Sequence, residues 1–248
     1  MATLGRSTKS GSDWTRNELR AYNITVAPQD VITFFGNPTL PQPSVHKVIL
    51  DNKKYPPDGI ADKADRNFFF YLEAAMSIPP GGESAFGDFV AHLLGFSDIT
   101  FLMCGKYTTA MTDVYMISRR DTKILLVVQE DKQFLEGVDP EPQLIAQAIA
   151  AFQCNNLLLE SNGKEPIRAK IIPGIVIFGT TPTFYKISVT QDLVDAVEGA
   201  RYPANPTIVH KLIPPVEDLY GLDMDGMQPL NNRAVILGCF EAFKQFVD

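Results

Sequence analysis

The feature that most constrains the fold is an apolar run, ILLVV at residues 124–128, that is followed at once by Gln-Glu-Asp-Lys at 129–132. Five consecutive aliphatic residues are typical of a strand that is covered on both faces, in the middle of a sheet. Charged side chains are costly inside a sheet, so we expect Glu130 and Lys132 to lie where this strand ends. The run therefore predicts a central strand that presents charged groups at one edge of the sheet.

Helix and strand patterns alternate around this run, with no linker-like segment between them. The short connection at 119–122 predicts a hairpin between strands 112–118 and 123–129. The other expected strands cover 100–104, 174–179, 183–189 and 207–213, and the expected helices cover 65–76, 83–94, 143–153, 190–198 and 231–246. We therefore predict a single α/β domain over residues 1–248.

The N-terminal region gives fewer signals. Residues 1–13 are small and polar, and we expect them to be frayed or disordered. The sequence Thr15-Arg16-Asn17-Glu18 has the spacing of a capping box, which predicts the start of a short helix. Prolines are dense from 27 to 58, so we expect an extended loop there with at most one short strand near 45–50.

Charge and cysteine content exclude some classes of protein. Lysine and arginine total 22 against 29 acids, a formal charge of −7, which argues against a polybasic protein that binds nucleic acid mainly by neutralising phosphates. A local basic cleft is compatible with this balance. The three cysteines are far apart, and neither a secretory signal nor a membrane-spanning segment is evident. We therefore expect an intracellular protein, cytoplasmic or nuclear.

A second carboxylate, Asp113, opens the strand that precedes the apolar run. A symmetric hairpin about 119–122 pairs position 113 with 128 or with 130, and then Asp113, Glu130 and Lys132 project from one face. A one-residue slip of the register would separate them, and the sequence allows both. Two carboxylates at one point are hard oxygen ligands for Mg²⁺ or Mn²⁺, and a nearby lysine can position or deprotonate a water.

This pattern resembles the PD-(D/E)xK nuclease superfamily, with Thr112 in place of the proline before the first aspartate. The resemblance implies a restriction-endonuclease-like core over about 83–190, a central mixed sheet flanked by helices. It also implies that Asp113 and Glu130 are metal ligands, that Lys132 acts on the attacking water, and that the preceding helix carries a further acidic ligand, for which Glu83 is the candidate. The following helix often carries a glutamine in this family, for which Gln147 fits best and Gln143 lies one turn earlier.

The resemblance further implies metal-dependent hydrolysis of nucleic acid, either DNA or RNA. A homodimer is compatible with it, because members that cut both strands commonly dimerise. The segments at 140–153, 179–185 and 239–244 are also similar to those of uncharacterised fungal proteins, a similarity that suggests the same nuclease-like fold.

Other interpretations of the same residues stay open. Glu130 and Lys132 also fit a solvated strand end with a surface ion pair, and the two glutamines fit polar positions on an amphipathic helix. The aromatic triplet at 68–70 fits a core better than a platform for base stacking. The functional alternative is a catalytically silent protein of the same fold that serves as a binding or assembly module. A third, an unrelated α/β enzyme for a small acidic metabolite, has no motif of its own.

Overall fold

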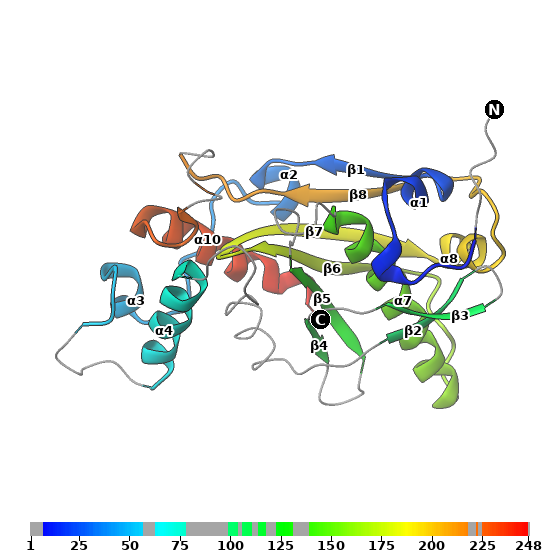
Figure 1. Cartoon of the computed structure of the whole chain (residues 1–248), viewed down its shortest axis with the longest axis horizontal. Coiled ribbons are helices and arrows are strands. Elements are labelled where there is room, and N and C mark those ends of the chain that lie inside the picture. Colours follow the sequence, from blue (N-terminus) through cyan, green and yellow to red (C-terminus); the bar gives the residue numbers. More distant parts are fainter. Residues whose placement is uncertain are drawn as a thin grey trace.

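The chain forms a mixed β-sheet with helices on both faces (Figure 1). The computed structural model describes residues 7–56, 63–77, 99–103, 106–110, 114–117, 123–130, 139–217, 222 and 225–247. The six-stranded sheet has the order β1-β8-β7-β6-β5-β4. Its strands are β1 (Ile24–Pro28), β4 (Val114–Ile117), β5 (Ile124–Glu130), β6 (Ala169–Phe178), β7 (Thr181–Thr190) and β8 (Thr207–Leu212). A separate two-stranded sheet pairs β2 (Ile99–Met103) with β3 (Lys106–Ala110).

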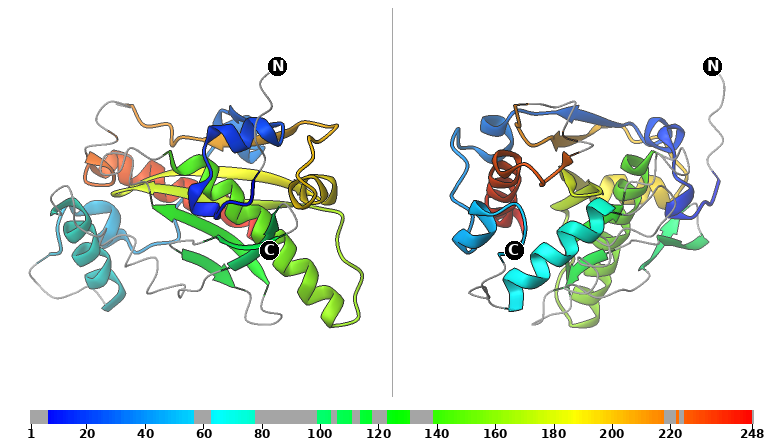
Figure 2. Two further views of the ribbon diagram at one scale, coloured as in Figure 1. Left: turned by 45° about the vertical axis from the view of Figure 1, so that its right-hand side comes forward. Right: turned by 60° about the vertical axis from the view of Figure 1, so that its left-hand side comes forward.

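The helices divide between the two faces of the large sheet (Figure 2). The long helix α7 (Pro140–Ser161) packs on one face together with η1 (Gly11–Asp13), α1 (Arg16–Ala21) and α8 (Gln191–Glu198). The opposite face is covered by α2 (Val31–Phe35), α4 (Lys63–Ser77), α10 (Leu230–Phe243) and η2 (Lys244–Phe246). The short helix α3 (Lys47–Asp51) contacts α4 and α10. In the part of the chain that the structure describes, no helix is long and apolar enough to cross a membrane.

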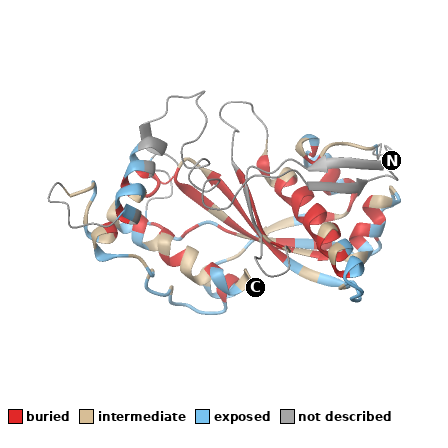
Figure 3. Ribbon diagram, turned by 90° about the horizontal axis from the view of Figure 1, so that it is seen from below, coloured by how far each residue is buried: buried red, intermediate tan, exposed pale blue. Residues whose placement is uncertain are grey.

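Strand β5 is central to both hydrophobic cores, as its apolar run predicts. Val127 belongs to the core under α7, whereas Leu126 and Val128 belong to the core under α10. Figure 3 shows the resulting band of buried residues through the middle of the sheet. Strand β5 also runs parallel to β6, and α7 makes the crossover between them. The sequence therefore predicted the α/β class correctly, as well as a strand with both faces covered, but β5 lies next to the edge strand β4 and not in the middle of the sheet.

Several other elements agree with the sequence analysis. The expected helix at 65–76 is α4, and α8 and α10 lie where they were expected. Strands β6 and β7 pair as an antiparallel hairpin, with Gly179 at a positive φ of 56° in the turn. The capping box is present at α1: the Thr15 side chain accepts a hydrogen bond from the Asn17 amide, and the Glu18 carboxylate accepts one from the Thr15 amide.

The prediction for residues 27–58 is wrong in detail. A helix, α3, occupies 47–51 in place of the expected strand, and a second helix, α2, precedes it. Asp30 is the N-cap of α2, and its side chain accepts a hydrogen bond from the Thr33 amide; Gly36, with a φ of 77°, is the C-cap. The density of prolines hid both helices, because each is only five residues long and fits between prolines.

Residues 7–13 also differ from the expectation that they are frayed. They include η1, in which Gly11 is buried. The next residue, Trp14, is fully buried and stacks on Tyr22 at a ring-centroid distance of 5.7 Å. This N-terminal segment therefore contributes to the core under α7. The expected helix at 83–94 lies outside the described residues.

Candidate active site at the carboxyl end of strand β5

Glu130 is the last residue of β5, and it pairs with Ile177 of the parallel strand β6. The carboxyl ends of parallel strands form one edge of the sheet, and in α/β proteins this edge is where ligands bind. Glu130 therefore lies where the sequence predicted it, at the carboxyl end of a strand that is covered on both faces. Asp113, Lys132 and Glu83 lie outside the described residues, and for Glu130 the structure describes the backbone.

The predicted pairing of the hairpin is correct only near its turn. Ile117 pairs with Ile124, as a symmetric hairpin requires, but Met116 pairs with Leu126 and Val114 with Val128. A β-bulge therefore adds one residue to β5 and shifts the rest of the register. The sequence predicted that position 113 pairs with 128 or 130, but Val128 pairs with Val114. The observed register therefore does not support the prediction that Asp113, Glu130 and Lys132 share one face of the sheet. The convergence of Asp113, Glu130 and Lys132 stays a prediction.

Gln147 is the predicted site residue whose surroundings are described most fully. It is fully buried on α7, and its Nε2 donates a hydrogen bond to Oε1 of Gln129, which is also buried. Gln129 immediately precedes Glu130 in β5. Gln143 does not join this pair, because its Nε2 donates instead to the backbone oxygen of Ser12 at 2.6 Å. The structure thus brings Gln147, and not Gln143, against the end of β5.

Close packing of α7 on the sheet makes this contact geometrically possible. A side-chain Cβ at Gly174 in β6 would lie 3.0 Å from a methyl group of Leu144, so the small residue lets the helix approach. At its far end, Asn155 of α7 makes two hydrogen bonds with the backbone of Ile124, at 2.7 and 2.8 Å. Helix α7 is therefore fixed on β5 at both ends of the strand.

A charged network that the sequence analysis missed fixes the first turn of α7. The Glu141 carboxylate accepts hydrogen bonds from the Tyr185 hydroxyl at 3.0 Å and from the Lys211 ammonium at 2.5 Å. Arg16 pairs with Asp139, the N-cap residue of α7, at 2.6 Å. No local pattern signals this contact, because Glu141 is remote in sequence from Tyr185 and Lys211, which pair with each other across β7 and β8. Because these charges already pair with one another, we interpret the network as an anchor for α7.

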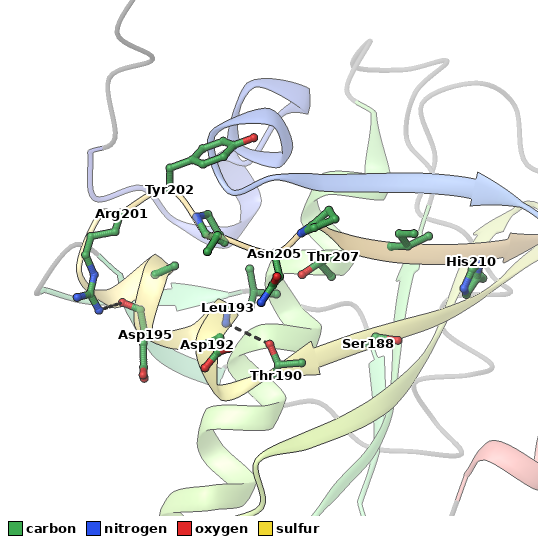
Figure 4. Close-up of a pocket in the computed structure, with 15 residues that line it drawn as sticks. Ser188, Thr190, Asp192, Leu193, Asp195, Arg201, Tyr202, Asn205, Thr207 and His210 are labelled. Atoms are coloured by element: carbon green, nitrogen blue, oxygen red, sulfur yellow. Dashed lines mark hydrogen bonds between the residues drawn. The ribbon is translucent and has the colours of Figure 1, made fainter.

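Two hollows lie away from the end of β5. One, with a volume of about 590 Å³, lies beside the amino end of β8 and includes Thr207, Tyr202 and His210 (Figure 4). Burial, followed by the charge of Lys186 on the neighbouring strand, lowers the pKa of His210. Because β8 is parallel to β5 across β6 and β7, this hollow lies toward the opposite end of the sheet from Glu130. It therefore does not belong to the candidate site.

The second hollow, of about 1080 Å³, lies between the last turns of α7, the segment 165–168 and helix α8. Its charged lining is mostly acidic, with Arg168 as a basic member and the following acids: Glu160, Glu165, Asp192, Asp195 and Glu198. Burial, followed by the charge of Asp195, raises the pKa of Glu198. An acidic hollow is unsuited to the phosphates of nucleic acid.

Within the described ranges, no three histidine, cysteine or acidic side chains are grouped so that they could hold a metal ion. Two of the three predicted ligands, Asp113 and Glu83, fall outside those ranges, so the metal stays a prediction. No protein-family model matches the chain, and no curated protein sequence matches it.

Proposed function

We propose that the protein is a metal-dependent nuclease of the PD-(D/E)xK type, which hydrolyses phosphodiester bonds in nucleic acid. The observation that carries the proposal is the position of Glu130, as the last residue of a strand covered on both faces and parallel to its neighbour β6. The order of hairpin, helix and parallel strand, namely β4-β5-α7-β6, agrees with the restriction-endonuclease-like core that the resemblance implies.

The proposed roles follow from the chemistry of the side chains. Asp113 and Glu130, with Glu83 as a further candidate, supply the hard oxygen donors that Mg²⁺ or Mn²⁺ prefers. A bound metal of this kind supplies Lewis-acid stabilisation of the charge that develops on the phosphodiester. Lys132 orients the attacking water or accepts its proton. Gln147 acts as a positioning residue, because its buried hydrogen bond anchors the side chain of Gln129, the residue just before Glu130.

The test is cleavage of single- and double-stranded DNA and RNA in the presence of Mg²⁺, Mn²⁺ or a chelator. We expect Glu130→Gln and Lys132→Ala to lower the rate by roughly 10²-fold or more, the scale of a lost acid–base or ligand group. Matched controls are Glu160→Gln, in the last turn of α7, and Lys164→Ala, just after this helix; both change exposed residues. These controls keep the charge changes equal, so they should cleave at the wild-type rate.

Two results would contradict the proposal. Cleavage that survives in both Glu130→Gln and Lys132→Ala would point to a contaminant or another site. A folded wild-type protein that cuts none of the four substrates would favour the catalytically silent alternative, a binding or assembly module of the same fold.

A further inference from the structure

The outward face of α4 combines positive charge with an exposed aromatic ring. Lys63, Arg66 and Phe70 follow one another at intervals of three and four residues, so they lie along one side of the helix. All three are exposed, and the Phe70 side chain is 65% accessible. Phe69 and Leu72 occupy the opposite, buried side. The triplet at 68–70 is therefore not wholly core, which corrects the sequence analysis.

More cations lie beside this face. The Arg66 guanidinium carbon is 5.7 Å from the ring centroid of Tyr55, which itself makes an edge contact with Phe69 at 6.0 Å. Lys53 and Lys54 immediately precede Tyr55 and are exposed. In the portion of the chain that the structure describes, none of the four cations at 53, 54, 63 and 66 forms an ion pair with a carboxylate.

Two acids also belong to α4, and they leave this positive character in place. Asp65 is on the buried side and pairs with His46 at 2.9 Å. Glu73 is exposed, one turn beyond Phe70 toward the end of the helix. The cationic part of the face is thus its first two turns, next to Tyr55. Such a concentration is notable in a chain whose formal charge is −7.

The inner side of α4 connects this face to the candidate active site. Leu72 belongs to the same hydrophobic core as Leu126 and Val128 of β5 and Ile177 of β6. Ile177 is the residue that pairs with Glu130. Figure 1 also shows α3 and α4 on the side toward which the arrow of β8, parallel to β5, points. Helix α4 therefore lies toward the same end of the sheet as Glu130, with its outward face turned away from the core.

We propose that this surface, formed by residues 53–55 and the outward side of α4, binds single-stranded nucleic acid. The inference rests on the proposed function and names the form of its substrate. The lysines and Arg66 contact phosphates, and the exposed ring of Phe70 stacks on a base. Stacking needs an unpaired base, which a single strand offers and an intact duplex does not. An amphipathic helix that binds a membrane would instead expose several apolar side chains. Among the described outward positions of α4, Phe70 is the single apolar side chain that is exposed.

Fluorescence anisotropy with a labelled oligothymidylate tests this proposal in the presence of a chelator, so that binding is measured without cleavage. We expect Phe70→Ala to weaken binding by about 5- to 150-fold, the range reported for the loss of one stacked base. Lys63→Ala and Arg66→Ala should weaken it at low salt and should each make the slope of log affinity against log salt shallower by about 0.7. All three side chains are exposed, so the variants should keep the wild-type melting temperature.

The control is a similar pair at the other end of the sheet, Arg201 and Tyr202, both exposed. Tyr202→Ala and Arg201→Ala should bind like the wild type. Equal loss in these controls, full affinity of Phe70→Ala, tighter binding of a duplex of equal length, or binding only to phosphatidylserine vesicles would each overturn the inference.

Cleavage assays on the same proteins separate the two proposals. Binding that depends on Phe70 without any cleavage would contradict the nuclease and retain this surface. Cleavage that depends on Glu130 but is unchanged in Phe70→Ala would support the nuclease and contradict the role of this surface. If both proposals hold, Phe70→Ala raises KM on single strands with little change in kcat, because its contact lies away from the reacting phosphate.

Discussion

Replacement of Arg233 by methionine is expected to destabilise the protein more than any surface change. Arg233 is a fully buried residue of α10, and its guanidinium donates hydrogen bonds to four backbone oxygens. The acceptors are Met227 at 2.9 Å, Ile49 at 2.7 Å, Asn52 at 2.5 Å and Lys53 at 3.4 Å. Three of these oxygens belong to α3 and the residues after it, so one side chain connects that segment to α10.

The magnitude follows from the number of contacts and from the cost of burying a cation. Each of the three shorter bonds has a charged donor and contributes about 1.5–3 kcal/mol. Burial of the cation opposes this gain, and it lowers the pKa of Arg233. Among the described residues, no carboxylate pairs with the guanidinium to offset this cost. Arg233→Met removes the charge but leaves the oxygens without their donors. We therefore expect a loss of about 3–5 kcal/mol in the free energy of unfolding.

Urea unfolding followed by circular dichroism and by the fluorescence of Trp14, the single tryptophan, measures this loss. For a chain of this size the same loss lowers the melting temperature by about 6–20 °C. Arg168→Met, at an exposed position, is the matched control and should change stability by less than about 0.5 kcal/mol. A loss below about 1 kcal/mol for Arg233→Met would refute the reasoning, because it would mean that the backbone oxygens find other donors.

Three more predictions concern α7, α8 and the sheet. Gln147→Leu should lower the free energy of unfolding by about 1–3 kcal/mol, because it leaves the buried amide of Gln129 without this partner. The double variant with Gln129→Leu should recover part of that loss, so strictly additive effects in urea unfolding would contradict the pairing. Gly174→Ala should lower the free energy of unfolding by about 1–3 kcal/mol, because its new methyl group meets Leu144. An unchanged melting temperature would contradict this. Burial raises the pKa of Glu198, so its ionisation opposes folding at neutral pH; Glu198→Gln should therefore raise the melting temperature at pH 7, and the gain should vanish as the pH falls below about 4.

The existence of β5 and the burial of both its faces were predictable from sequence, because they follow from a few consecutive residues. The aliphatic run requires two covered faces, and the structure provides one core for Val127 and another for Leu126 and Val128. The register beyond the turn was not predictable in the same way. The bulge between β4 and β5 inserts one residue without any glycine or proline to indicate it, and a single residue is enough to exchange the faces of a strand.

The short helices show the opposite case, in which the stabilising partner is remote. A five-residue helix such as α3 is too short to be stable alone. Arg233 on α10 holds the backbone oxygen of Ile49 in this helix and those of the two residues that follow it. No local pattern could reveal that contact. Helix α2 did carry a local signal, since Asp30 caps it and Gly36 ends it, but the surrounding prolines favoured a loop. At the candidate site, the sequence indicated Gln147 as a glutamine of the second helix, but its partner Gln129 emerged only from the packing of α7.

The pairing of β1 with β8 has a consequence for how the chain is made. Ile24 precedes its partner Thr207 by 183 residues in the order of synthesis. At about 5–20 residues per second, the N-terminal segment leaves the ribosome on the order of 10–40 s before that partner exists. Trp14 and Tyr22, both buried in the finished protein, remain exposed to water and to chaperones at least until α7, which packs over them, has been made. The docking of β1 on the sheet therefore has to wait until β8 has been translated.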